Sequence, residues 1–315
     1  MTTAFVLSGG GSLGAVQVGM LQSLAERDVQ PDLLVGTSAG AVNSAYVAGH
    51  GTGRQALDDL AAIWMGLRRR DVFPVDPLRH LLAVAGARPS LCASHALGRL
   101  LAAHLPYPRL EDAAIPVHVV ATDLLSGREV VLSTGDAVSA VLASAAIPAV
   151  FPAVERDGLT LVDGGIADNA AISQAVALGA DRVFVLPTGY ACALEAPPAT
   201  PLATALHALS LLIEQRLILE VTHFAERVEV NVLPPLCPLT VASVDFRHAG
   251  ELIDRARQAT GDWLDTGGPA LPRPERFLSL HHHDRRSTDQ TGSHACAASR
   301  TQHPAEEEIV RGGRS

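Results

Sequence analysis

A serine in a glycine-flanked turn is the residue of this chain best suited to nucleophilic chemistry. Ser38 lies in a Gly-x-Ser-x-Gly motif with Gly36 and Gly40, between a predicted strand at residues 33–35 and a helical run at residues 41–48. Such a strand–turn–helix arrangement is typical of a nucleophile elbow, in which small glycines let the turn close and the hydroxyl stands clear of the sheet. The motif therefore predicts that Ser38 attacks an acyl carbonyl.

A glycine-rich loop is the second chemical feature. Its glycines are Gly9, Gly10, Gly11 and Gly14, and it joins a predicted strand to a predicted helix. Backbone N–H groups at the start of a helix attract negative charge, so the loop is suited to a pyrophosphate or to the oxyanion of acyl transfer. A turn without any ligand is a third interpretation.

A carboxylate followed by two glycines is the third feature. Asp163, Gly164 and Gly165 come directly after a short strand predicted at residues 159–162. If that strand ends at the same sheet edge as the two loops, Asp163 lies beside them, although Asp-Gly-Gly alone is also an ordinary turn. An esterase needs a nucleophile, a base and an oxyanion hole at one edge, and the three motifs supply one each.

In their chain order (glycine-rich loop, Gly-x-Ser-x-Gly turn, Asp-Gly-Gly), the three motifs resemble those of the patatin-like phospholipases. The similarity continues in residues 143–148, 151–152 and 168–169, and it covers roughly residues 3–262. The resemblance implies a three-layer α/β/α fold with a mainly parallel central sheet and a nucleophile elbow between a strand and a helix. It also implies hydrolysis of phospholipid or other acyl-ester substrates, in lipid breakdown or remodelling, without a metal or cofactor.

The resemblance assigns roles to single residues as well. Ser38 would be the nucleophile and Asp163 the proton acceptor of a Ser–Asp dyad that forms an acyl-enzyme. The oxyanion hole would consist of Gly9, Gly10 and Gly11, with the N–H groups of Gly10 and Gly11 binding the oxygen and Gly9 shaping the loop. The remaining motif glycines would support these turns: Gly14, Gly36, Gly40, Gly164 and Gly165.

The order of predicted elements indicates one α/β domain followed by a tail. The first 50 residues alternate strand, helix, strand and helix, which is typical of a parallel sheet with helical crossovers. We expect a domain over residues 3–264, in which residues 54–105 form a helical cap-like region that matches the family weakly. Ala171 stands where many members have proline. Residues 266–315 become polar and are expected to be disordered.

A different mechanism would use a histidine as the base. A Ser–His–Asp triad in the α/β-hydrolase order needs a histidine after the aspartate, and His207, His223 and His248 are the candidates. That fold places several strands before its elbow, whereas only two are predicted before Ser38.

Two functions of other classes are also open. Gly9, Gly11 and Gly14 satisfy the dinucleotide-binding pattern Gly-x-Gly-x-x-Gly, but the predicted second strand does not end in the acidic residue that the pattern requires. A lipid-binding protein without catalysis is the other alternative, against which both dyad residues are present. Labelling of Ser38 by a serine-directed phosphonate separates binding from catalysis.

The amino-acid composition disfavours or excludes several classes of protein. The chain has 315 residues and a net charge of −9, which disfavours a nucleic-acid partner, and all 24 basic residues are arginine, which excludes a lysine Schiff base. Four scattered cysteines form no Cys-x-x-Cys pair. The first arginine is Arg27, so the start lacks the basic region of a signal peptide. We expect a cytoplasmic protein without a transmembrane helix, able to contact a membrane surface transiently.

Overall fold

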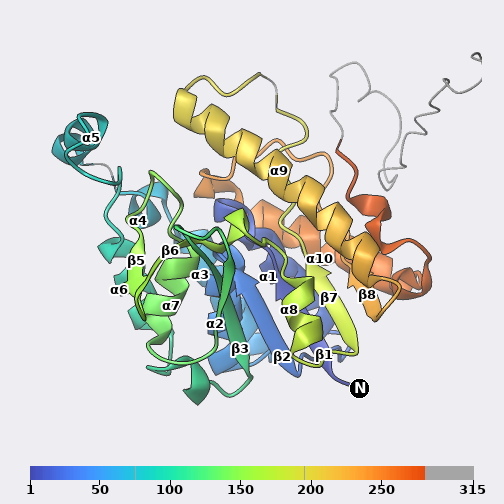
Figure 1. The fold of residues 1–315 in the computed structure, drawn as a ribbon. Coiled ribbons are helices and arrows are strands. Elements are labelled where there is room, and N and C mark those ends of the chain that lie inside the picture. The colour runs from blue at the N-terminus through green and yellow to red at the C-terminus, as the bar shows by residue number, and fades with distance from the viewer. Residues whose placement is uncertain (75, 195, 281–315) are drawn as a thin grey trace, which may run out of the picture.

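The computed structural model describes residues 1–74, 76–194 and 196–280, which are arranged in three layers (Figure 1). Within these residues, eight strands form one mixed sheet, and helices cover both of its faces. The strands are β1 (Thr3–Leu7), β2 (Leu33–Thr37), β3 (Val117–Asp123), β4 (Glu129–Leu132), β5 (Val154–Arg156), β6 (Leu159–Asp163), β7 (Arg182–Leu186) and β8 (Glu229–Val232).

Helices and short 3-10 turns connect these strands. The α-helices are α1 (Gly14–Ala25), α2 (Ala39–His50), α3 (Arg54–Gly66), α4 (Arg69–Val72), α5 (Pro77–Val84), α6 (His95–His104), α7 (Ala137–Ser144), α8 (Ile172–Ala177), α9 (Pro201–Phe224) and α10 (Ala249–Asp265). The 3-10 turns are η1 (Gly11–Leu13), η2 (Leu110–Asp112), η3 (Gly164–Ile166), η4 (Phe246–His248), η5 (Gly268–Ala270) and η6 (Pro274–Phe277).

The centre of the sheet is parallel and buried on both faces. The strand order is β5-β6-β3-β2-β1-β7-β8, and β4 pairs with β3 outside this order. The five neighbouring strands β3, β2, β1, β7 and β8 run parallel. Along β1, Phe5 and Leu7 enter one core and Ala4 and Val6 the other, because successive side chains of a strand point to opposite faces. The first core includes α1, α2 and α10, and the second includes α8 and α9. This confirms the predicted α/β fold.

Strand β6, which carries Asp163, runs antiparallel to its neighbour β3. Strand β4 takes one edge of β3, and β2 and β6 share the other edge: Val120 pairs with Thr37, and the next residue, Ala121, pairs with Asp163. The C-terminal ends of β2 and β6 therefore meet head-on along β3. Ser38 follows Thr37 directly in the chain, so Ser38 and Asp163 lie next to each other at this junction.

The region predicted as a helical cap contains α3 to α6, and the buried side chains of α3 and α6 belong to the first core. At the other end of the chain, residues 266–280 hold η5 and η6, and Leu278 is fully buried in the second core. This part of the predicted tail is packed; the rest of it, residues 281–315, lies outside the described residues. Among the described helices, none combines the length and hydropathy needed to cross a membrane.

Candidate active site

Ser38 occupies a strained turn between β2 and α2. Its φ of 52° and ψ of −118° lie in a region that residues with a side chain rarely adopt, which is a feature of nucleophile elbows. A Cβ on Gly36 would lie 2.6 Å from the carbonyl oxygen of Gly40, and a Cβ on Gly40 would collide with the carbonyl oxygen of Leu7. Glycine at both positions therefore lets the turn close over the end of β1.

The hydroxyl of Ser38 donates a hydrogen bond directly to Asp163, with 2.7 Å between Oγ and Oδ2. The second carboxylate oxygen, Oδ1, accepts the N–H of Gly165 at 2.9 Å, which fixes the orientation of the carboxylate. Both side chains are buried. Burial raises the pKa of Asp163 from 3.8 to about 6, and the hydrogen bonds from Ser38 and Gly165 oppose that rise. The raised pKa makes Asp163 a stronger base than an exposed carboxylate.

Ser144 fixes the backbone of Ser38 through a hydrogen bond. The N–H of Ser38 donates to Oγ of Ser144 at 2.8 Å, and the Ser144 hydroxyl donates to the carbonyl oxygen of Val120 at 2.5 Å. Ser144 is the last residue of α7, more than 100 residues from Ser38 in sequence. Sequence reasoning noted Ser144 only as part of a family segment, because nothing local in the sequence links it to Ser38.

The glycine-rich loop lies against Ser38. A Cβ on Gly9 would lie 2.9 Å from Cβ of Ser38. The N–H of Gly9 donates to Oδ1 of Asn169 at 3.0 Å, and its carbonyl oxygen accepts the Thr188 hydroxyl at 2.7 Å. Gly9 therefore shapes the loop, and its N–H is already used. The N–H groups of Gly10 and Gly11 donate to no acceptor within the described part of the chain.

The other motif glycines are closely packed. A Cβ on Gly14, the first residue of α1, would lie 2.7 Å from the ring of Trp64. Gly164 begins η3, where a Cβ would collide with the carbonyl oxygen of Val120. A Cβ on Gly165 would lie 3.0 Å from Oδ1 of Asn169. Because these residues have no side chain, the loops at the ends of β1, β2 and β6 can pack closely together.

A buried chain of amides connects the glycine-rich loop to α3. The side-chain N–H group of Gln17 donates to the carbonyl oxygens of Ser8, at 2.8 Å, and Leu186, at 2.9 Å. The amide of Asn43 donates to Oε1 of Gln17 at 2.8 Å and accepts the indole N–H of Trp64 at 2.8 Å. Leaving a buried amide without a hydrogen-bond partner costs free energy. The paired amides therefore fix α1, α2 and α3 relative to the glycine-rich loop.

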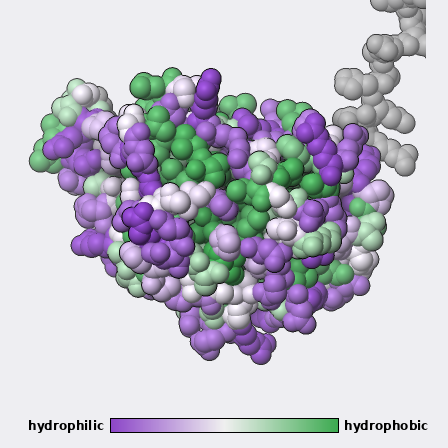
Figure 2. Space-filling view, turned by 60° about the horizontal axis from the view of Figure 1, so that its bottom comes forward, coloured by the Kyte–Doolittle hydropathy of each residue, from purple (hydrophilic) through white to green (hydrophobic). Residues whose placement is uncertain are grey.

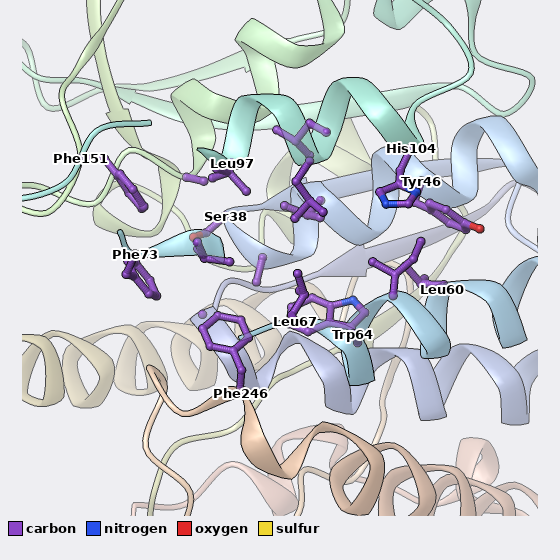
Figure 3. Close-up of a pocket in the computed structure, with 18 of the residues that line it drawn as sticks. Ser38, Tyr46, Leu60, Trp64, Leu67, Phe73, Leu97, His104, Phe151 and Phe246 are labelled. Atoms are coloured by element: carbon purple, nitrogen blue, oxygen red, sulfur yellow. The ribbon is translucent and has the colours of Figure 1, made fainter. Parts of the chain in front are cut away.

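A narrow apolar pocket begins at Ser38 and runs between α2, α3 and α6. Figure 3 shows Ser38 at one part of it, Phe73 and Phe151 nearby, and Tyr46 and His104 at its far end. Its volume is about 80 Å³. Val42 and Tyr46 follow Ser38 at intervals of four residues and line the pocket from one face of α2. The wall is almost entirely hydrocarbon, which suits an alkyl chain.

A second, wider cavity of about 410 Å³ shares Ser38 and Gly11 with the first and is lined by more polar groups. Asp163 lines this cavity and not the narrow pocket. Its far wall comes from α9, where Glu214 is only 5% exposed and has no hydrogen-bond partner among the described residues. Burial raises the pKa of Glu214 to about 7. Sequence reasoning missed Glu214, because only the packing of α9 buries it.

None of the three candidate histidines completes a triad. His207 lines the wider cavity, His223 packs on Phe224, and His248 lies 3.6 Å from a carboxylate oxygen of Glu251. Across residues 1–74, 76–194 and 196–280, no histidine hydrogen-bonds to either member of the Ser–Asp pair. The same residues contain no group of His, Cys, Asp and Glu that could hold a metal ion.

Comparison with known families adds an independent observation. The family model described as patatin-like phospholipase matches residues 5–176, which include Ser38, Asp163 and the glycine-rich loop.

Individual proteins show similarity over part of their length. An uncharacterized NTE family protein of Mycobacterium bovis is 33% identical over 203 residues, which cover 64% of this chain and 53% of that protein. A lysophospholipase NTE1 of Pyricularia oryzae is 24% identical over 195 residues, which cover 60% of this chain and 12% of that protein. The chain thus matches about half the length of the first relative and a small part of the second.

Among solved structures, VipD from Legionella pneumophila aligns with a TM-score of 0.45 and 15% sequence identity, over 84% of this chain and 67% of that one. A similarity this low carries no inference about function.

Proposed function

The chain belongs to the patatin-like phospholipase family, and on this premise we propose that it hydrolyses acyl esters of lipids through a Ser38–Asp163 dyad. The observation that carries the proposal is the direct hydrogen bond from Ser38 Oγ to Asp163 Oδ2, at the point where an apolar pocket and a wider cavity meet. The lysophospholipase named among the relatives fits this substrate class.

In the first half of the reaction, Ser38 Oγ attacks the ester carbonyl and Asp163 takes the hydroxyl proton. The carbonyl oxygen becomes an oxyanion, for which the unpaired N–H groups of Gly10 and Gly11 are the available donors. The intermediate collapses when the bond to the leaving alcohol breaks and Asp163 returns the proton to the alcohol oxygen. An acyl-enzyme ester on Ser38 remains.

In the second half, water replaces the alcohol. Asp163 takes a proton from the water, whose oxygen attacks the acyl-enzyme carbonyl. Collapse of this second intermediate releases the carboxylic acid and returns the proton to Ser38 Oγ. No step requires a group beyond the ester, the water and these residues.

The position of Asp163 supports different roles for the two cavities. The proton of Asp163 must reach the leaving oxygen, so the leaving group lies on the side that Asp163 lines, which is the wider cavity. The acyl chain then enters the narrow pocket between α2, α3 and α6. A wide, partly polar cavity suits a glycerol or head group, and a narrow hydrocarbon pocket suits a single alkyl chain.

The test is hydrolysis of a series of chromogenic acyl esters by the wild type, Ser38→Ala and Asp163→Asn. We expect kcat/KM to fall at least about 10³-fold in both variants, because members of a catalytic unit act together. Mass spectrometry after treatment with a serine-directed phosphonate locates the label. Activity that survives Ser38→Ala contradicts the dyad. A wild type that binds lipid but neither hydrolyses esters nor takes the label contradicts catalysis and favours a lipid-binding role.

A further inference from the structure

The segment beside the mouth of the wider cavity is basic in an otherwise acidic protein. Residues 68–88 contain five arginines and only two aspartates, whereas the whole chain has a net charge of −9. Arg68, Arg69, Arg70 and Arg88 are exposed, and Arg69 lines the wider cavity. A local concentration of arginine on an acidic chain indicates attraction to an anionic partner at this place.

Exposed leucines accompany these arginines on α5. Leu78 is 65% exposed and Leu81 is 66% exposed. The helix begins at a formed N-cap, in which Asp76 accepts the N–H groups of Leu78 and Arg79, so the two leucines are held one turn apart. Figure 1 shows α5 projecting from the body of the protein, and the lobe at the left of Figure 2 carries hydrophobic and hydrophilic side chains next to each other.

The opposite side of the same mouth is uncharged. Residues 201–213 of α9 contain no acidic residue and no arginine, and His207 is their one ionisable side chain. Ala205, Ala208 and Leu212 of this stretch are exposed. The wider cavity is lined by Arg69 and His80 from the first rim and by Ala203, Leu206, His207, Leu209 and Ser210 from the second, so both rims border one opening. A helix in contact with water alone usually carries charges on its exposed face.

We propose that these two rims form a docking surface for an anionic lipid bilayer, with the arginines at the head groups and the leucines in the interface. The docking surface consists of Arg68, Arg69, Arg70, Leu78, Leu81 and Arg88 with the exposed side of residues 203–212. Exposed apolar side chains together with arginine are the combination that binds anionic membrane interfaces. The inference deepens the proposed function, because a docked bilayer would deliver its lipids to the opening above Ser38.

The experiment measures vesicle binding by sedimentation, using the full chain with Ser38→Ala so that no lipid is consumed. Vesicles of phosphatidylcholine alone are compared with vesicles that contain 30 mol% (about one lipid in three) phosphatidylglycerol, at low and high salt. We expect binding to the anionic vesicles at least about tenfold tighter than to the neutral ones, and weaker binding at high salt.

Two double variants test the two chemistries. Leu78→Gln with Leu81→Gln removes the apolar contact, and Arg70→Gln with Arg88→Gln removes two charges; each pair should weaken binding to anionic vesicles about tenfold. Leu124→Gln with Leu125→Gln is the matched control, since these leucines are 52% and 87% exposed in the turn between β3 and β4. Circular dichroism confirms that each variant is folded.

Several outcomes overturn the proposal. Equal binding to neutral and anionic vesicles, or no binding to either, removes the anionic bilayer as the partner. Vesicle binding that the arginine pair weakens and the leucine pair does not would contradict the insertion of the leucines into the interface, and with it the proposed docking surface. Hydrolysis of a water-soluble acetyl ester by the chain with native Ser38 separates the two ideas. If that ester is cleaved and vesicles do not bind, the docking proposal is wrong and the proposed hydrolase function stands. If vesicles bind and no ester is cleaved, the proposed function is wrong and the docking proposal stands.

Discussion

Ser144 and Ser38 are joined by a hydrogen bond of 2.8 Å, in which the N–H of the proposed nucleophile donates to a side chain from the end of α7. The Ser144 hydroxyl in turn donates a hydrogen bond to the carbonyl oxygen of Val120 in β3, at 2.5 Å. A residue with φ of 52° is held only where its surroundings compensate for the strain. Ser144 thus ties the strained turn to the strand along which β2 and β6 meet.

Ser144→Ala is expected to lower kcat with little change in KM. The substitution leaves the buried N–H of Ser38 without its acceptor, which costs about 1–3 kcal/mol and loosens the turn. We expect kcat to fall about tenfold or more and the rate of phosphonate labelling to fall with it. Steady-state kinetics and thermal unfolding provide the measurements.

The matched control is Ser44→Ala, on α2. The hydroxyl of Ser44 is buried and has no hydrogen-bond partner among the described residues, so its removal should leave kcat unchanged. Equal kcat in Ser144→Ala and the wild type would show that Ser144 does not position the nucleophile.

The activity is expected to rise with pH through about 6. Asp163 must be ionised to accept the proton of Ser38, and burial places its pKa at about 6. The plot of kcat/KM against pH should therefore have an acidic limb near this value and a plateau above it. The midpoint should be the same in His207→Gln. A midpoint that moves in this variant would mean that a histidine, and not Asp163, controls the proton.

The length of the acyl chain is expected to be limited by Tyr46. Tyr46 lies eight residues after Ser38 on one face of α2, which corresponds to about 12 Å along the helix axis. An extended chain advances about 1.2 Å per bond, so an acyl group of about ten carbons reaches Tyr46. Hydrolysis of chromogenic esters should therefore be fastest near this length and slower for chains of about 16 carbons.

Val42→Phe tests this limit from inside the pocket. Val42 lies halfway between Ser38 and Tyr46, so a phenyl ring there should block the deeper part of the pocket. We expect the ratio of decanoyl to acetyl ester hydrolysis to fall at least about tenfold, a loss of about 1.4 kcal/mol in discrimination. Ala62→Phe adds the same ring to the exposed side of α3 and should not change the ratio. An unchanged profile in Val42→Phe would place the acyl chain elsewhere.

Glu214→Gln is expected to stabilise the protein at alkaline pH. The pKa of Glu214 is about 7 in the folded protein against 4.5 unfolded, so the folded state binds this proton more tightly. Its contribution to stability is complete below pH 4.5 and is lost as the pH rises through 7. The variant should gain up to about 3 kcal/mol over the wild type at pH 8 and almost nothing at pH 4.5.

Denaturant unfolding at several pH values measures this difference. Glu226→Gln, which changes an exposed glutamate near the end of α9, should not produce it. If Glu214→Gln is less stable than the wild type at pH 8, the carboxylate has a stabilising partner and the interpretation of Glu214 as unpaired is wrong.

Most of the candidate site could be predicted from the sequence, because its parts are local. The turn at Ser38, the glycine-rich loop and the Asp-Gly-Gly motif each need only a few neighbouring residues to form, and their glycines mark places where the backbone is close to another chain segment. The direction of β6 could not be predicted, since the strand is short and either direction suits its apolar residues. Asp163 could be proposed from its place after a strand, whereas the head-on meeting of β2 and β6 that brings it to Ser38 follows only from the strand pairing.

The sequence by itself determined which groups are available for chemistry: one serine in an elbow, one carboxylate before two glycines, and a glycine-rich loop whose backbone N–H groups lie at the start of a helix. Only the tertiary structure decided how they meet, because contacts between distant residues depend on strand order and packing. It joined Ser38 to Asp163 without a histidine, supplied Ser144 as a support and divided the space at Ser38 into two cavities. It also buried Glu214 and exposed Leu78, although both are on helices, since burial is set by what packs against a helix.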